Sequence, residues 1–151
     1  MVTIHVTRTT TAPPERVTAA LTDFSGHRFE IFANLDRRHF SVHQAGPTSA
    51  EVTEGASFLG GIWERIRYDW AEPGVIRLQC LDSNAFTPES SWLYRLDRDG
   101  TGGTRVDLTI TRIPRGIKGR VLVSMLRVLG TKALGDDLAR TLRAIEAAPG
   151  N

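Results

Sequence analysis

This sequence has little cysteine, little excess of one charge and no long apolar run, and each shortage excludes a class of protein. The single cysteine, Cys80, cannot form an intramolecular disulfide, which fits a reducing compartment. No apolar stretch approaches the roughly 20 residues of a membrane-spanning helix. The N-terminus MVTIHVTRTT also lacks the charged and then apolar organisation of a signal peptide. We therefore expect a cytoplasmic protein with no stable membrane insertion.

The charges are nearly balanced, with 19 basic and 17 acidic residues that alternate along the chain. A nucleic-acid surface needs clustered basic residues with aromatic side chains to stack on bases. The nearest approach is the segment 112–127, which we interpret as the solvated start of a helix, so no nucleic-acid partner is predicted. A length of 151 residues with 40% hydrophobic residues predicts one globular domain, residues 1–151, around a single core.

Signals for metals and cofactors are also missing. The glycine-rich segment 100–103 lacks the lysine and the following helix of a phosphate-binding loop, and it is interpreted as a hairpin turn. His39 and His43 share one face of a predicted strand, and with His27 from the second short helix they would supply three zinc ligands. Phe40 and Val42 take the core-facing positions there, however, which places both strand histidines in solvent. No metal site and no cofactor are predicted.

Two periodicities divide the chain into strands and helices. Residues 2–6 alternate between apolar and polar, which predicts a strand. The prolines at 13–14 cannot donate to a β-ladder but suit the first turn of a helix, so a short helix should follow, with a second near 27–33. Turn signals such as the Glu-Pro-Gly at 72–74 then separate a series of alternating segments. The strands expected in this series cover residues 39–45, 49–54, 61–70, 75–82, 90–97 and 104–113.

A long helix is expected from about Gly116 to Ala147, before the Pro-Gly pair that follows it. Within it two apolar series step by four residues, but the join between them, from Leu129 to Leu134, is five residues. The extra residue rotates the apolar stripe by roughly a third of a turn. Gly130 lies at this slip, so we expect the helix to bend there.

Three motifs accompany this order of elements: APPERVTAALTD at residues 12–23, WAEPG at 70–74, and WLY at 92–94 followed by GGTRV at 102–106. Together they resemble the Bet v 1-like, or START-related (SRPBCC), superfamily, in its polyketide cyclase and dehydrase branch. The resemblance covers nearly the whole chain. It implies an α+β helix-grip fold, in which a seven-stranded antiparallel curved sheet, two short helices and a long C-terminal helix enclose a cavity. The cavity would hold a lipid-like, polyketide-like or aromatic ligand.

The residues alone also favour a cavity, because one helix cannot fill a strongly curved sheet along its whole length, and ligand sites are typically concave and mostly apolar. Polar groups on the inner face are then candidates for chemistry. Glu64 shares the predicted inward face with Tyr68, and a buried carboxylate has either a raised pKa or a cationic partner. Alternatively, a bulge near 60–61 reverses the register, so that Trp63 faces inward and Glu64 outward. Tyr68 and Tyr94 could donate to a carbonyl or an oxyanion, or simply pack in the wall.

The remaining ligand contacts are predicted from the more apolar face of each strand, from one loop and from the long helix. Met125 and Leu129 are the helix residues expected at the ligand, since methionine adapts to irregular contents. Phe86 is expected at the cavity mouth or as a loop anchor, and Cys80 as a small buried hydrophobe rather than a nucleophile. The full set predicted to contact the ligand is Ile66, Tyr68, Leu78, Cys80, Phe86, Trp92, Tyr94, Leu108, Met125 and Leu129.

Three functions are compatible with the sequence. The first is a protein that binds a small hydrophobic ligand in its cavity. The second is an enzyme of the polyketide cyclase, aromatase or dehydrase kind, with Glu64, Tyr68 or Tyr94 handling protons. The third is an interaction module for a ribosomal or quinone-linked partner, which should show an exposed apolar or basic patch, for example around residues 115–120.

Overall fold

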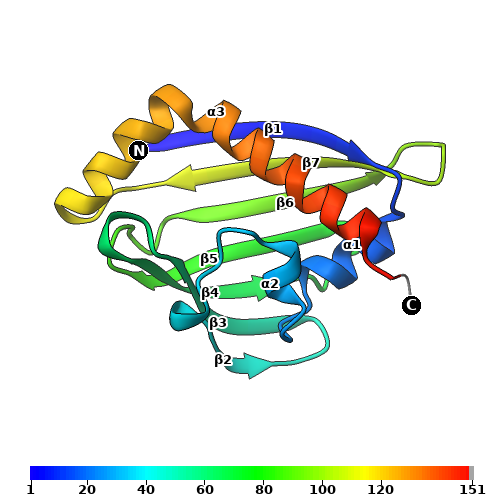
Figure 1. Ribbon diagram of the computed structural model, residues 1–151, viewed down its shortest axis with the longest axis horizontal. Coiled ribbons are helices and arrows are strands. Elements are labelled where there is room, and N and C mark those ends of the chain that lie inside the picture. Colours follow the sequence, from blue (N-terminus) through cyan, green and yellow to red (C-terminus); the bar gives the residue numbers. More distant parts are fainter. Residues whose placement is uncertain (150–151) are drawn as a thin grey trace.

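The computed structural model describes residues 1–149, and its elements follow the predicted order (Figure 1). The strands are β1 (Val2–Thr10), β2 (Ser41–Ala45), β3 (Ser49–Ala56), β4 (Ile62–Asp69), β5 (Val75–Ser83), β6 (Ser91–Arg98) and β7 (Thr104–Arg112). The helices are α1 (Pro14–Leu21), α2 (Arg28–Ile31) and α3 (Gly116–Ala147), with 3-10 turns η1 (Arg37–His39) and η2 (Phe58–Gly60). The strand predicted from residue 39 begins at Ser41, because η1 occupies residues 37–39.

All seven strands form one antiparallel sheet in the order β1-β7-β6-β5-β4-β3-β2. The strands β2 to β7 are a meander, and β1 completes the sheet by pairing with β7 along its whole length. Figure 1 shows α3 crossing one face of the sheet, with α1 and α2 on the same side. The predicted helix-grip fold is therefore confirmed, and one face of the sheet is covered by helices.

The register of β4 decides where Glu64 points. β4 keeps an unbroken register with β3 from end to end, and side chains alternate along a strand, so Glu64 lies on the same face as Tyr68. Glu64 is accordingly buried, whereas Trp63 is only partly buried. The alternative in which a bulge near 60–61 turns Glu64 outward is wrong. A bulge does occur, but it lies in the pairing of β4 with β5, and it leaves the β4 side chains in place.

The long helix α3 packs closely on the β5–β6 loop and on the sheet through two glycines. A Cβ at Gly119 would collide with the carbonyl oxygen of Ala85, and a Cβ at Gly130 would collide with the side chain of Ile4. α3 is nevertheless one continuous helix of 32 residues. As the sequence predicts, it is not straight, and Figure 1 shows its N-terminal part running at an angle to its C-terminal part.

Two hydrophobic clusters hold the fold together. The larger lies between the sheet, α1 and the C-terminal half of α3, around residues such as Val17, Val106 and Leu142. The smaller joins Phe86 to Val123 near the start of α3. Within residues 1–149, no helix is long and apolar enough to cross a membrane.

Candidate functional site

A cavity of about 400 Å³ lies between the inner face of the sheet, η2 and α3. This volume falls within the range of about 300–1,000 Å³ that is typical of small-molecule sites. Its wall is mostly apolar and draws on both hydrophobic clusters. Six of the ten residues predicted to contact a ligand lie in the wall of this cavity: Ile66, Tyr68, Leu78, Phe86, Trp92 and Tyr94.

Two other predicted residues lie beside the cavity. Leu108 lines a smaller chamber of about 160 Å³, which shares Trp92 and Tyr94 with the main cavity. Cys80 is buried, and its Sγ lies 3.6 Å from the carbonyl oxygen of Asp82. Burial raises the pKa of the Cys80 thiol to about 12. Little thiolate therefore forms at neutral pH, which agrees with a packing role for this residue.

The prediction that Met125 and Leu129 line the cavity is wrong. Their side chains are 40% and 58% exposed, and the residues of this part of α3 that line the cavity are Leu122 and Leu126. Steps of four residues advance around a helix by more than one turn, so the predicted series drifts away from the sheet. The buried face of this part of α3 contains Gly119 instead, and a glycine has no side chain that a hydrophobic pattern could detect.

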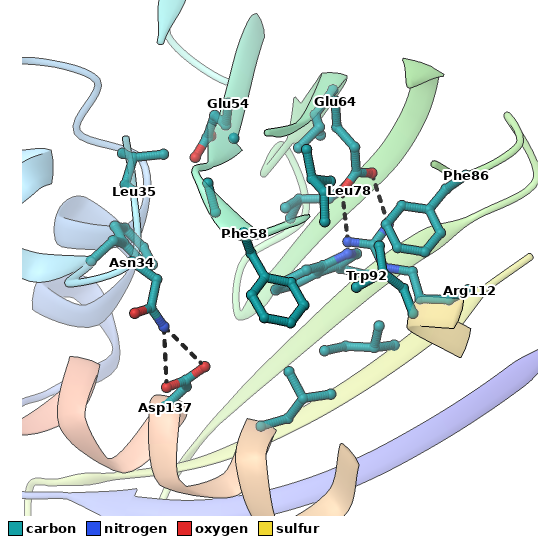
Figure 2. A pocket seen from close by; sticks show the side chains of 18 of the residues that line it. Asn34, Leu35, Glu54, Phe58, Glu64, Leu78, Phe86, Trp92, Arg112 and Asp137 are labelled. Carbon is teal, nitrogen blue, oxygen red and sulfur yellow. Dashed lines mark hydrogen bonds and ion pairs between the residues drawn. The ribbon is translucent and has the colours of Figure 1, made fainter. Parts of the chain in front are cut away.

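One polar group in the wall is a buried ion pair between β7 and β4. Both guanidinium nitrogens Nη1 and Nη2 of Arg112 donate to the Glu64 carboxylate, each at 2.7 Å. The two residues are only 5% and 8% exposed, and the guanidinium lies over the rings of Phe86 and Trp92, 4.3 and 4.8 Å from the ring centres. Figure 2 shows this pair at one side of the cavity. Glu64 thus has a cationic partner, which is one of the two alternatives that the sequence left open for a buried carboxylate.

A second network joins α2 to β3 and β4. Arg28, which is 1% exposed, donates from Nη2 to Oε1 of Glu54 at 2.8 Å and to the Tyr68 hydroxyl at 2.6 Å. The Tyr68 hydroxyl in turn donates to Glu54 Oε1 at 2.6 Å. Burial raises the pKa of Tyr68 well above its ordinary value, and the Glu54 carboxylate adds to this effect. Burial alone would lower the pKa of Arg28, but Tyr68 and Glu54 hold it above its ordinary value, so Arg28 stays charged.

The two networks balance each other in charge. Glu54 and Glu64 are directly opposite on β3 and β4, where two like charges would repel. Arg28 neutralises the first and Arg112 neutralises the second. The charged residues that line the cavity are therefore two cations, each with a carboxylate partner, and one further carboxylate, Asp137.

Tyr94 differs from Tyr68, because its hydroxyl has no hydrogen-bond partner among residues 1–149. Burial raises the pKa of Tyr94 well above its ordinary value, so the phenol stays protonated at neutral pH. A protonated, unpartnered phenol in a cavity wall can donate a hydrogen bond to an oxygen atom of a ligand.

At the rim of the cavity, Asn34 Nδ2 donates to both carboxylate oxygens of Asp137 on α3, each at 3.4 Å (Figure 2). Phe58 of η2 also lines the cavity and is 48% exposed. These side chains come from three separate segments of the chain, which meet at the rim.

Sequence reasoning missed Arg28, Glu54 and Arg112, the charged partners in the wall. Arg112 continues the inward series of alternate residues on β7, and Glu54 continues that of β3, so strand parity could have found both. Arg28 lies on a helix of four residues, which is too short to have a recognisable apolar face. No local signal in the sequence indicates its position.

Comparison with known proteins agrees with this fold. A protein from Thermus thermophilus superposes with a TM-score of 0.79 at 19% identity, over 99% of this chain and 100% of that one. The Zhui aromatase/cyclase from a Streptomyces species superposes with a TM-score of 0.78 at 21% identity, over 99% of each chain. A START superfamily protein from Mycobacterium smegmatis gives a TM-score of 0.68 at 13% identity, over 95% of this chain and 94% of that one. At these identities the likeness shows the fold alone.

No curated protein matches the chain in sequence. A match at the level of a whole family is found, however, and it extends over residues 1–148. That family is described as polyketide cyclase / dehydrase and lipid transport. Because the match spans nearly all of the sequence, the chain belongs to the polyketide cyclase / dehydrase and lipid transport family.

Proposed function

We propose that the protein binds a small, uncharged ligand of polyketide-like or aromatic character in the cavity between the sheet and α3. The observation that carries this proposal is a mostly apolar cavity in which both cations are already paired with carboxylates. An apolar wall with a few placed polar groups is typical of small-molecule sites.

The paired charges favour an uncharged ligand over a fatty acid or another anion. An anionic ligand would have to compete with Glu64 for Arg112, and that carboxylate is already held by two hydrogen bonds of 2.7 Å. It would also add a further negative charge to a site that already has three carboxylates and only two cations, which is costly. A ketone or quinone oxygen needs only a hydrogen-bond donor, and the Tyr94 hydroxyl supplies one.

Blocking the cavity tests the proposal. We expect Leu126→Trp to weaken the binding of Nile red, an uncharged polycyclic ketone, by about ten-fold or more. The larger indole ring would occupy space in the cavity that the dye needs. Fluorescence titration measures the affinity. Dodecanoate should displace the dye poorly from the unmodified protein.

The matched control is Met125→Trp, one residue away on the exposed side of α3. Its affinity for Nile red should stay within about two-fold of that of the unmodified protein, since Met125 lies outside the cavity wall. Equal losses in the two variants, or tighter binding of dodecanoate than of the dye, would count against a cavity for uncharged ligands.

The Tyr94 hydroxyl favours a second candidate function, an enzyme that cyclises or dehydrates a polyketide. A phenol that donates to a carbonyl stabilises the charge that develops on that oxygen in an aldol-type step. Glu64 and Tyr68 are less suited to this role, because both already have strong internal partners.

Tyr94→Phe separates catalysis from binding. If the chain is an enzyme, this variant should bind Nile red no more than about ten-fold more weakly, the cost of one hydrogen bond, but lose about 100-fold or more of its rate with a linear poly-β-ketone thioester. Absorbance of the aromatic product follows the reaction. If neither protein converts the thioester, while both bind the dye, the chain is a binding protein and the enzymatic alternative fails.

A further inference from the structure

The exposed surface of α3 and η2 carries an unusual number of large apolar side chains. Ile117 and Val128 on α3 are 80% and 81% exposed, and neither lines the cavity. Contiguous exposed apolar patches on a protein surface mark sites of interaction. We call this set the docking face, and its members are Ile117, Val121, Met125, Val128 and Leu129 of α3 with Phe58 and Leu59 of η2.

The two parts of the docking face meet at the mouth of the cavity. Lys118 Nζ on α3 donates to the carbonyl oxygen of Gly61, next to η2, at 2.9 Å. Leu122 of α3 and Phe58 of η2 both line the cavity, and Figure 2 shows the Phe58 ring extending from η2 into the cavity region. The apolar wall of the cavity thus continues outward onto the docking face.

Basic residues lie among and beside the docking-face residues of α3 in the sequence. Residues 115–135 contain five basic residues and no acidic residue. Arg115 pairs with Asp82, and Lys132 pairs with Asp136. The other three cations, Lys118, Arg120 and Arg127, form no ion pair with a carboxylate anywhere in residues 1–149.

The positive charge of these basic residues determines which kind of partner the docking face can bind. Two copies of the chain joined through the docking face would bring the unpaired cations of each copy together, and such like-charge contacts are unfavourable. An anionic partner is attracted by the same cations. Electrostatic complementarity therefore favours an anionic surface over a second copy of this chain.

We propose that the docking face binds the surface of a lipid bilayer that contains acidic phospholipids, with the mouth of the cavity toward the bilayer. A helix with an apolar face and flanking Lys or Arg residues lies in the interface of such membranes. Cations near an acidic leaflet each add to the attraction. The side chains at 117 and 128 project from the convex surface of a helix, which suits insertion between lipid headgroups better than the matched pockets of a protein partner.

The inference does not depend on which ligand the cavity takes, although an opening toward a bilayer suits an apolar ligand. It is also compatible with the finding that no helix in residues 1–149 could cross a membrane, since only side chains of the docking face enter the interface.

Flotation with lipid vesicles tests the proposal. We expect the unmodified protein to bind vesicles of phosphatidylcholine with phosphatidylglycerol about ten-fold or more tightly than vesicles of phosphatidylcholine alone, and to lose this preference at high salt. The double variant Ile117→Ser, Val128→Ser should bind the acidic vesicles about ten-fold or more weakly, because two apolar side chains no longer enter the interface. Arg120→Gln should reduce the preference for acidic lipid.

The control variant is Val42→Ser on β2, an apolar residue of 43% exposure that lies outside the docking face. It should bind acidic vesicles as the unmodified protein does. Unchanged thermal unfolding and unchanged Nile red affinity in all variants show that fold and cavity are intact. Either equal binding to both kinds of vesicle, or binding to polyglutamate but not to acidic vesicles, overturns the proposal, the latter in favour of an acidic protein partner. A dimer in solution that the double variant abolishes overturns it in favour of self-association.

Discussion

Arg112→Ala should lower the free energy of unfolding by about 3–5 kcal/mol, the cost of leaving one partner of a buried ion pair alone. The substitution leaves the Glu64 carboxylate 8% exposed in the native protein and without its two hydrogen bonds from Arg112. It also removes the cation that lies over the rings of Phe86 and Trp92. Urea denaturation followed by circular dichroism measures the loss, provided that the slope of the transition is unchanged.

Two further variants show whether burial is the cause. Arg105 is on the same strand as Arg112, and its ion pair with Asp97 is exposed, so Arg105→Ala should cost no more than about 1 kcal/mol. Replacing both partners, with Glu64→Leu and Arg112→Leu together, should restore much of the stability, because apolar pairs often replace buried ion pairs without loss. A cost below about 1 kcal/mol for Arg112→Ala would mean that water reaches this pair and screens it.

The stability of the variant with both leucines also bears on whether the ion pair helps to select the ligand. If the apolar pair is as stable as the charged one, the ion pair is not needed for folding, and its retention agrees with a role in the cavity. The test is then to measure the affinities for dodecanoate and for Nile red, and to compare their ratio in the double variant with that in the unmodified protein. A change in this ratio would indicate that Arg112 and Glu64 help to select the ligand.

The fold could be predicted from the sequence because its elements have strong local signals. The alternation of Val2, Ile4 and Val6 and the prolines at 13–14 indicate the first strand and helix. The turns after β4 and β6 have glycines at positive φ, Gly74 and then Gly100 and Gly102, as the turn signals predict. Strand parity also placed Tyr68 and Tyr94 in the cavity wall, because a period of two leaves only two possible faces.

The site was predicted less well, because its chemistry depends on contacts between distant residues. Arg28 meets Glu54 and Tyr68 only after α2 packs on the sheet, and nothing in the sequence near Arg28 indicates this. The orientation of α3 was missed for a different reason. Its packing face contains Gly119 and Gly130, which are buried by close backbone approach rather than by an apolar side chain.

Raising the pH should destabilise the protein steeply, because three buried acids keep their protons in the folded state. Burial raises the pKa of Cys80 from 9.0 to about 12, and it raises the pKa values of Tyr68 and Tyr94 well above the ordinary 10.0. In the unfolded chain the thiol ionises near pH 9 and the phenols near pH 10. The folded state therefore binds more protons in this range, so the free energy of unfolding falls as the pH rises.

The size of this effect follows because, in this pH range, each of the three groups keeps one proton in the folded state that it loses in the unfolded chain. Each group lowers the free energy of unfolding by about 1.4 kcal/mol per pH unit between its unfolded and folded pKa values. Only Cys80 contributes just above pH 9, and all three groups contribute above pH 10, where the slope should reach about 4 kcal/mol per pH unit. Urea denaturation at a series of pH values gives the slope, and tyrosinate absorbance should rise only as the protein unfolds.

Tyr94→Phe is the sharpest control, because the Tyr94 hydroxyl has no hydrogen-bond partner within residues 1–149 and its loss should disturb little else. This variant should reduce the slope above pH 10 by about 1.4 kcal/mol per pH unit, the share of a single proton. Tyrosinate absorbance that rises near pH 10 in a protein that is still folded would contradict the prediction. That result would mean that water enters the cavity freely enough to solvate the phenolate, and the case for a dry site that prefers uncharged ligands would weaken with it.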